Sequence, residues 1–190
     1  MERTLYLSYS KHSEKEEVKN YKEHLASIST FIFDVDGVLT DGKVFITTSG
    51  EQYRNMNIKD GYALQLAVKK GFNVAIISGG NNEGVRVRLK GLGLTDIYLG
   101  QRHKMDAFED LLAIYDLKEE NVLYMGDDIP DYEVMQRAGI AVCPNDAAEE
   151  IKSISDYVSP IKGGSGCVRD ILEQTMKAQN KWMNGDGFEW

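Results

Sequence analysis

The sequence predicts an α/β fold: a doubly wound, Rossmann-like and mostly parallel sheet with a small β-hairpin flap and no cap domain. Three observations predict it. Short apolar runs typical of buried strands alternate with helix-forming segments along the chain. Polar residues follow several of these runs directly, as happens where buried parallel strands end at a ligand site. Two β-rich runs that flank Ser49-Gly50 indicate a hairpin.

The expected elements begin with a buried strand, Phe31 to Phe33, which has no polar face. The hairpin flap follows at 41–57. Asp60 is expected to cap the next helix, and Gly71 to end it. Further strands are expected at 73–77, 96–99, 121–125, 140–143 and 157–159, and helices at 61–70, 81–92, 103–115, 132–138, 147–153 and 167–182.

The length of 190 residues suits one domain with a sizeable core, placed at 29–183 between an N-terminal extension, 1–28, and a tail, 184–190. The extension has one amphipathic helix, expected over 14–28. A net charge of −8 argues against binding to nucleic acid or to an anionic membrane. No stretch reaches the roughly 18 apolar residues that span a bilayer. Two cysteines without a CxxC pattern indicate a reducing compartment, so we expect a cytoplasmic protein.

Two aspartates, Asp34 and Asp36, come directly after the first strand. In an extended chain residues i and i+2 point the same way, so both carboxylates are expected to face one pocket. Adjacent carboxylates repel each other, and a hard cation such as Mg²⁺ between their oxygens removes the repulsion. A plain turn is the alternative for an isolated Asp-x-Asp-Gly sequence, but it does not explain the polar residues that end later strands.

The later polar residues are Ser78, Lys104, Asp127 and Asp131, each placed just past an expected strand. Parallel strands bring such ends to one edge of the sheet. Alone, the serine is an ordinary turn residue and the lysine a solvated one. Together they form the kind of set that phosphoryl transfer requires, because that reaction depends on positioning and on charge neutralisation.

The run from Asp34 to Gly42, DVDGVLTDG, resembles the first motif of the haloacid dehalogenase superfamily of phosphotransferases. Ser78, Lys104 and the segment Gly126-Asp-Asp-Ile-Pro-Asp131 resemble its other three motifs, in the same order. The similarity extends from about 29 to 172. More narrowly, the chain resembles the capless branch that hydrolyses 3-deoxy-manno-octulosonate (KDO) 8-phosphate for bacterial lipopolysaccharide.

This resemblance implies catalytic roles for four residues. Asp34 is the nucleophile that forms an aspartyl-phosphate, and Asp36 is the general acid and then the general base. Ser78 hydrogen-bonds the phosphoryl group, and Lys104 offsets its developing charge.

A metal site is implied as well. Mg²⁺ would be held by Asp34, by Asp127 and by the backbone carbonyl of Asp36. Asp131 would orient Lys104 or a metal-bound water, and Asp128 would support the site.

The resemblance further implies a sugar-acid phosphate as substrate and a homotetramer in which the hairpins pack together, with active sites at subunit interfaces. Gly80 and Ser165 stand where many relatives have arginine. Because a guanidinium fork holds a carboxylate best, these two departures leave the identity of the sugar acid open. Candidate substrate-binding residues are Gly79, Arg54, Lys59, Lys162 and Arg169.

Four alternatives remain at this point. The substrate is a related nine-carbon sugar-acid 9-phosphate, or the enzyme is a generic phosphomonoesterase. A receiver-like signalling domain uses similar residue types, but it carries its acceptor aspartate on a middle strand. A non-catalytic scaffold subunit would not need all four motifs.

Overall fold

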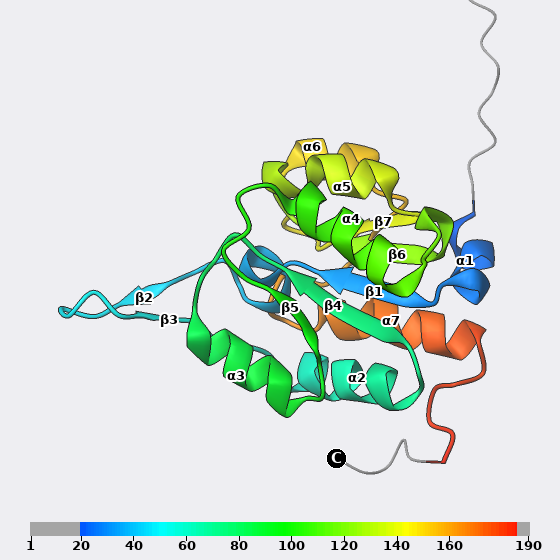
Figure 1. Ribbon diagram of the computed structural model, residues 1–190, viewed down its shortest axis with the longest axis horizontal. Coiled ribbons are helices and arrows are strands. Elements are labelled where there is room, and N and C mark those ends of the chain that lie inside the picture. The colour runs from blue at the N-terminus through cyan, green and yellow to red at the C-terminus, as the bar shows by residue number, and fades with distance from the viewer. Residues whose placement is uncertain (1–19, 186–190) are drawn as a thin grey trace, which may run out of the picture.

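A six-stranded parallel sheet forms the centre of the molecule (Figure 1). The computed structural model describes residues 20–185. The strand order is β5-β4-β1-β6-β7-β8, so the chain moves outward from β1 on one side and then returns to build the other. This order makes the end of β1 a topological switch point, where α/β sheets bind ligands. The strands are β1 (Thr30–Phe33), β4 (Asn73–Ile77), β5 (Asp96–Tyr98), β6 (Val122–Met125), β7 (Ile140–Cys143) and β8 (Tyr157–Val158).

Helices cover both faces of this sheet, as the doubly wound prediction requires (Figure 1). One layer contains α2 (Ile58–Lys69), α3 (Glu83–Gly91) and α7 (Cys167–Ala178). The other contains α4 (Lys104–Tyr115), α5 (Tyr132–Arg137) and α6 (Glu149–Ile154). None of the helices in residues 20–185 is long and apolar enough to cross a membrane.

The core consists of two apolar clusters, one on each face of the sheet. β1 is buried along its whole length, and its side chains alternate between the clusters. Phe31 and Phe33 belong to the first cluster and Ile32 to the second. Burial on both faces explains why this strand reads as an unbroken apolar run.

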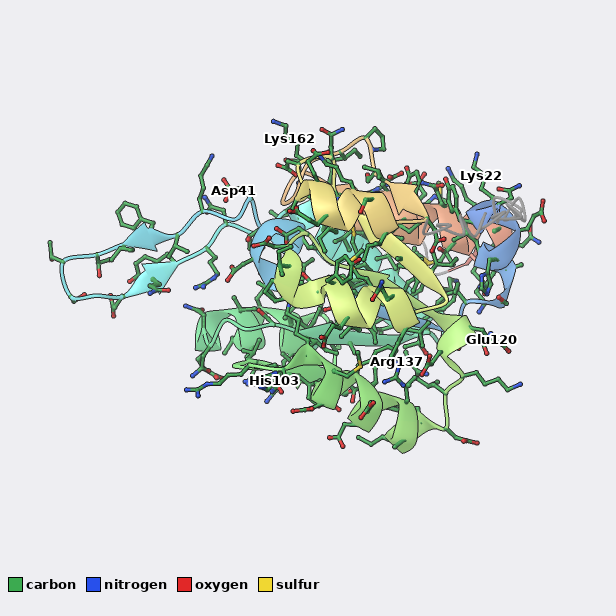
Figure 2. All side chains as sticks on the ribbon, turned by 90° about the horizontal axis from the view of Figure 1, so that it is seen from above. Lys22, Asp41, His103, Glu120, Arg137 and Lys162 are labelled. Carbon is green, nitrogen blue, oxygen red and sulfur yellow. The ribbon has the colours of Figure 1, made fainter. Side chains whose placement is uncertain are left out.

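The predicted hairpin extends away from the body of the molecule, as β2 (Phe45–Ile46) and antiparallel β3 (Gln52–Tyr53) (Figures 1 and 2). Phe45, Ile46 and Tyr53 are 69, 65 and 55 % exposed. An isolated two-stranded hairpin is marginally stable in water. Within the described part of the chain no separate cap domain covers the sheet edge, in agreement with the prediction.

Four local predictions need correction. The first part of the range 14–28, where one helix is expected, lies outside the described residues; within them the chain forms a short helix, α1 (Tyr21–His24), followed by a tight turn, Leu25–Ser27. The α4 helix begins at Lys104, one residue later than expected. The C-terminal helix, expected to reach residue 182, ends at Ala178. Asn180, just beyond it, adopts the left-handed conformation (φ 53°) common at helix ends.

The expected cap of α2 is also wrong. α2 starts earlier, at Ile58, because the Asn57 side chain accepts a hydrogen bond from the backbone N–H of Lys59 (2.8 Å). Asp60 instead lies inside α2 and accepts a hydrogen bond from the backbone N–H of Arg169 at the start of α7 (2.7 Å). Asp60 therefore joins two helices that are more than 100 residues apart in the sequence.

Candidate active site

The turn that follows β1 sets the geometry of the site. Asp34 extends the strand ladder, because its N–H donates to the carbonyl of Met125 (3.0 Å). The chain then makes a wide turn, Val35–Leu39, closed by the N–H of Thr40 on the carbonyl of Val35 (3.0 Å). The buried Thr40 hydroxyl also binds this turn, donating to the Val35 carbonyl (3.2 Å) and accepting from two backbone N–H groups. The turn therefore has one fixed shape beside the nucleophile candidate.

Only glycine fits at position 37 in this turn. Its φ is +87°, a region that favours glycine. A Cβ at this position would lie 1.9 Å from Asp127 Oδ2. The absence of a side chain thus lets the turn approach the Asp127 carboxylate, although the two residues are 90 positions apart in the sequence.

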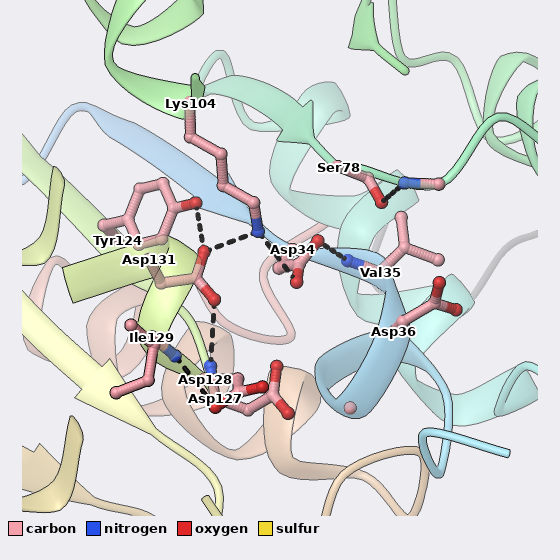
Figure 3. A network of polar contacts seen from close by, with 12 residues as sticks. Asp34, Val35, Asp36, Ser78, Lys104, Tyr124, Asp127, Asp128, Ile129 and Asp131 are labelled. Atoms are coloured by element: carbon pink, nitrogen blue, oxygen red, sulfur yellow. Dashed lines mark hydrogen bonds and ion pairs between the residues drawn. The ribbon is translucent and has the colours of Figure 1, made fainter. Parts of the chain in front are cut away.

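Lys104 lies between two carboxylates (Figure 3). Its Nζ is 2.9 Å from Asp34 Oδ2 and 2.7 Å from Asp131 Oδ1, and all three side chains are buried. Asp131 also accepts hydrogen bonds from the Tyr124 hydroxyl (2.6 Å) and from the Asp127 N–H (3.3 Å). Asp131 therefore fixes the lysine, the backbone of the last motif and a tyrosine together.

The electrostatics of this cluster favour an additional cation. Burial, together with the charges of Asp34 and Asp131, raises the pKa of Asp127 to about 8. Burial and the charge of Asp131 raise the pKa of Asp34 to about 6, against the opposing effect of Lys104. Burial lowers the pKa of Lys104, but the two carboxylates more than offset this, so its pKa lies above the ordinary value. One lysine thus faces three carboxylates.

The donor set fits a hard metal ion. Oxygens of Asp34, Asp127 and Asp131 lie within 4.8 Å of one another. Asp127 Oδ1 is buried and has no hydrogen-bond partner among the described residues. Such an unpaired buried oxygen is costly unless it binds a ligand. Both oxygens of Asp131 already accept hydrogen bonds, and those of Asp34 accept from the Val35 N–H (2.6 Å) and pair with Lys104 (2.9 Å). Asp127 Oδ1, beside Asp34, is therefore the oxygen best placed to hold a cation.

Ser78 follows β4, as expected, and is buried at the edge of the sheet. Its backbone N–H donates to the carbonyl of Tyr98 (2.9 Å), and its hydroxyl accepts from the N–H of Gly80 (3.2 Å). A cavity of about 390 Å³ opens beside it. The predicted residues that line this cavity are Asp34, Asp36, Ser78, Gly79, Lys104, Asp127, Asp128 and Asp131.

Asp36 faces this cavity too, but its carboxylate is already bound. Arg54 Nε is 2.6 Å from Asp36 Oδ1, and Arg54 Nη2 is 3.0 Å from Asp36 Oδ2. Arg54 follows β3 and lies with Asp36 and Ser78 along a narrow crevice beside the main cavity, too tight to hold a water molecule. The hairpin therefore contacts the turn Val35–Leu39, named the catalytic turn below for the role expected of Asp36, through this ion pair.

Three other predicted substrate contacts do not line the main cavity of the described chain. Lys59 and Lys162 are exposed. The Arg169 guanidinium lies over the rings of Tyr62 (5.7 Å) and Trp182 (5.2 Å) and pairs with Glu173 (3.3 Å). A single subunit thus brings Arg54 and Gly79 to the site and leaves these three cations outside it.

The glycine-rich loop before α7 supports the catalytic turn. A Cβ at Gly163 would lie 1.9 Å from the carbonyl oxygen of Gly37. The N–H of Gly164 donates to the carbonyl of Val38 (2.9 Å), and the Cys167 thiol donates to the same carbonyl (3.3 Å). These glycines are therefore required by a close approach of two backbones.

Sequence reasoning missed two residues of the site, Tyr124 and Thr40. Tyr124 is fully buried, and burial and the charge of Asp131 raise its pKa well above the ordinary value. The only signal in the sequence was a hydroxyl inside an otherwise apolar strand, Val122–Met125. A buried tyrosine hydroxyl usually has a hydrogen-bond partner, and that rule points to Tyr124.

Comparisons with known proteins agree with this fold and site. A family model for haloacid dehalogenase-like hydrolases matches residues 81–169. The 3-deoxy-D-manno-octulosonate 8-phosphate phosphatase KdsC of Escherichia coli K12 is 40 % identical over 155 residues, 82 % of each chain. The crystal structure of the corresponding phosphatase from Yersinia pestis has a TM-score of 0.84 and 36 % identity, and covers 86 % of this chain and 88 % of its own.

A further solved structure, the phosphatase from Moraxella catarrhalis in complex with magnesium, phosphate and KDO, has a TM-score of 0.81 and 33 % identity over 84 % of this chain and 91 % of its own. A parallel sheet with this set of motifs defines a phosphatase of the haloacid dehalogenase-like class. Within that class, the chain belongs to the 3-deoxy-D-manno-octulosonate 8-phosphate phosphatase family.

Proposed function

We propose that the protein is a Mg²⁺-dependent phosphomonoesterase that hydrolyses KDO 8-phosphate to KDO and phosphate through an aspartyl-phosphate intermediate. The observation that carries this proposal is the buried Asp34 carboxylate, held by Lys104 beside the unpaired oxygen of Asp127. The family relationship supports the substrate, since the named relatives are KDO 8-phosphate phosphatases.

Asp34 and Asp127, with the backbone carbonyl of Asp36, are proposed to hold Mg²⁺. The magnesium in the Moraxella catarrhalis structure supports this assignment, as do the hard oxygen donors. When bound, the ion supplies the positive charge that the three carboxylates lack and stabilises negative charge on the phosphoryl oxygens. Asp128, at the cavity rim, is proposed to support the Asp127 segment.

In the first step an oxygen of Asp34 attacks phosphorus. The bond between phosphorus and the sugar oxygen breaks, and Asp36 gives its proton to that oxygen, because an alkoxide is a poor leaving group. Lys104 and the Ser78 hydroxyl stabilise the charge that develops on the phosphoryl group. Asp131 keeps Lys104 in place for this task.

In the second step Asp36, now a carboxylate, takes a proton from water. The water oxygen attacks the phosphorus of the aspartyl-phosphate, and the bond from phosphorus to the Asp34 oxygen breaks. Phosphate leaves, Asp34 is regenerated as a carboxylate and Asp36 carries its proton again. Asp34 and Asp36 therefore carry the bond making and the proton transfers of both steps.

The sugar acid is proposed to contact Gly79 and Arg54 of the same subunit, with Lys59, Lys162 and Arg169 contributing through subunit contacts. The exposed apolar side chains of the hairpin support a homotetramer in which hairpins cover one another and the sites. We further propose that the enzyme acts in the cytoplasm and supplies KDO for lipopolysaccharide.

Phosphate release tests the proposal, with Mg²⁺ and a panel of KDO 8-phosphate, a nine-carbon sugar-acid 9-phosphate and neutral sugar phosphates. Asp34→Asn is the inactive control. Asp41→Asn makes the same chemical change at an exposed carboxylate whose side-chain contacts, within the described residues, are with the ammonium (3.5 Å) and the backbone N–H (3.1 Å) of Lys43, so it should keep full activity. We expect strong preference for KDO 8-phosphate, lost in Asp34→Asn.

Other outcomes separate the alternatives. Equal, weak turnover of every compound would indicate a generic phosphomonoesterase. A preference for the 9-phosphate would identify the nine-carbon sugar-acid 9-phosphate as the substrate. A long-lived acyl-phosphate without turnover would indicate a receiver, and no Asp34-dependent chemistry would indicate a scaffold.

A further inference from the structure

The ion pair between Arg54 and Asp36 occupies the residue that must act as acid and base. Both oxygens of Asp36 accept a hydrogen bond from the guanidinium, at 2.6 and 3.0 Å. The Arg54 side chain is only 8 % exposed, and its two donors to Asp36 form a bidentate fork. While this fork is closed, neither oxygen of Asp36 is free to deliver a proton to a leaving group.

The surroundings hold Arg54 in this position. The Asn82 side chain donates to the backbone carbonyl of Gln52 (2.8 Å), which ties the base of the hairpin to the loop after β4. A Cβ at Gly80 would lie 3.1 Å from Asp36 Oδ2 and 3.5 Å from Arg54 Nη2. The glycine thus leaves the space that the ion pair fills.

We propose that Arg54 restrains Asp36 in the substrate-free enzyme and transfers its guanidinium to the carboxylate of the substrate, so that only phosphate esters carrying a carboxylate free the acid. This inference rests on the proposed function, because it takes Asp36 as the acid and deepens the choice of substrate. Arg54 is then a specificity-determining residue for the class of acidic sugar phosphates.

The change of partner from Asp36 to the substrate carboxylate costs Arg54 little free energy. A guanidinium fork fits any carboxylate, so Arg54 gives up one pair of charge-assisted hydrogen bonds and gains an equivalent pair. A neutral sugar phosphate offers no such partner and leaves Asp36 held. Discrimination thus arises in the chemical step as well as in binding, which is the more effective use of a recognition contact.

The test compares Arg54→Ala with the parent enzyme on KDO 8-phosphate and on ribose 5-phosphate, a neutral sugar phosphate. We expect kcat/KM for KDO 8-phosphate to fall about 30-fold or more, the effect of losing hydrogen bonds between charged groups. We expect kcat for ribose 5-phosphate to rise severalfold, because Asp36 is no longer restrained. Arg54→Lys keeps the positive charge without the fork, so both of its rate constants should lie between those of the parent enzyme and those of Arg54→Ala.

Lys43→Ala is the matched control. It removes one positive charge from the same hairpin segment, where the side chain is 85 % exposed and forms, within residues 20–185, a single ion pair, with Asp41 (3.5 Å). The variant should leave the turnover of both substrates unchanged. If Arg54→Ala lowers turnover of both substrates by the same factor, the restraint is refuted and Arg54 merely positions Asp36. Circular dichroism and thermal unfolding of each variant separate misfolding from this result.

A crystal structure of the full chain with KDO and a phosphate analogue provides a second test. We expect Arg54 to contact the KDO carboxylate and to have left Asp36; an intact ion pair would overturn the inference. Failure of the proposed function looks different, since the parent enzyme would then show no preference for KDO 8-phosphate at all.

Discussion

At the residue scale, the proposed chemistry depends on the contacts of Asp131. It binds Lys104, the Tyr124 hydroxyl and the Asp127 N–H at once, so one carboxylate positions groups from two motifs and from strand β6. Networks of this kind are strong when every member is satisfied, and sensitive when one partner is removed.

Tyr124→Phe tests this network. The variant removes the 2.6 Å hydrogen bond to Asp131 and keeps the packing of the ring. We expect a loss of about 1 kcal/mol of unfolding free energy and a kcat several times lower, because Lys104 is held less firmly. Chemical denaturation and phosphate release measure the two effects.

The control for this variant is Tyr115→Phe, which removes an exposed 2.8 Å hydrogen bond to the half-buried Asp96 at the start of β5, a residue that does not line the main cavity of the described chain. It should change neither quantity appreciably. A Tyr124→Phe enzyme with unaltered kcat would show that Asp131 holds Lys104 without the tyrosine.

Metal binding is tested through Asp127. Its pKa of about 8 means that, in metal-free protein, this group's contribution to stability is present at low pH and is lost as the pH rises through about 8. A cation binds the deprotonated form, so we expect Mg²⁺ to raise the melting temperature at pH 8.5 and to do so much less at pH 6. At a concentration of about 100 times the Kd the gain is about 2.7 kcal/mol, or roughly 5–10 °C for a chain of this size.

Asp127→Asn is the comparison for thermal unfolding with EDTA and with Mg²⁺. The variant should lose most of the rise in melting temperature that Mg²⁺ causes in the parent. An equal rise in both proteins would mean that the ion does not bind at Asp127.

At the element scale, Asp60 couples helices α2 and α7. Its Oδ1 accepts the hydrogen bond from Arg169, and its Oδ2 is buried without a partner in residues 20–185. Burial raises its pKa from 3.8 to about 6, although the N–H groups of Arg169 and Gly166 oppose the rise. The contact thus fixes the start of α7, and with it the loop that supports the catalytic turn.

The raised pKa of Asp60 makes the unfolding free energy depend on pH in a definite direction. Because the folded pKa is raised, the contribution of Asp60 is fully present below pH 4 and is lost as the pH rises through about 6. A shift from 3.8 to about 6 corresponds to about 3 kcal/mol. Between pH 4 and pH 7 we expect the unfolding free energy of the parent to fall by about that much relative to Asp60→Asn.

Urea titrations of both proteins in EDTA measure the difference, and every other titrating group cancels between them. If the unfolding free energies of the two proteins changed equally with pH, Asp60 would be solvated or its charge would be compensated by its neighbours.

The elements also show what the sequence determines locally. Strand β1 and the positions of Asp34, Ser78 and Lys104 at the sheet edge were predictable, because apolar runs and chain order specify them. The role of Asp60 was not, since a capping rule considers only neighbouring residues and the partner is on α7. The fork between Arg54 and Asp36 was missed for the same reason.

At the scale of the whole molecule, the hairpin is the feature that a single subunit does not explain. Its apolar side chains are exposed, and it is joined to the body at the catalytic turn and through Asn82. The positions of Lys59, Lys162 and Arg169 outside the cavity fit the proposed sites between subunits, which the family resemblance implies and which no local pattern in this chain predicts. The division into extension, domain and tail stays a prediction.

Ile46→Asp tests the assembly. A charge in a buried apolar contact is costly, so we expect light scattering to show a homotetramer for the parent and a smaller species for the variant, with lower kcat/KM on KDO 8-phosphate. Ile114→Asp is the control, because Ile114 on α4 is 61 % exposed against 65 % for Ile46. A parent that is monomeric and fully active would refute the shared sites.

The contact of Gly163 and Gly164 with the turn at 35–39 bears on how the enzyme is made. Every proposed catalytic side chain lies before residue 132, yet the backbone that supports the turn is synthesised some 30 residues later, followed by α7. A nascent chain with all its chemical groups translated therefore still lacks the support that shapes them. We expect a ribosome-bound chain to stay inactive until α7 has emerged and docked, so that catalysis requires synthesis at least through α7.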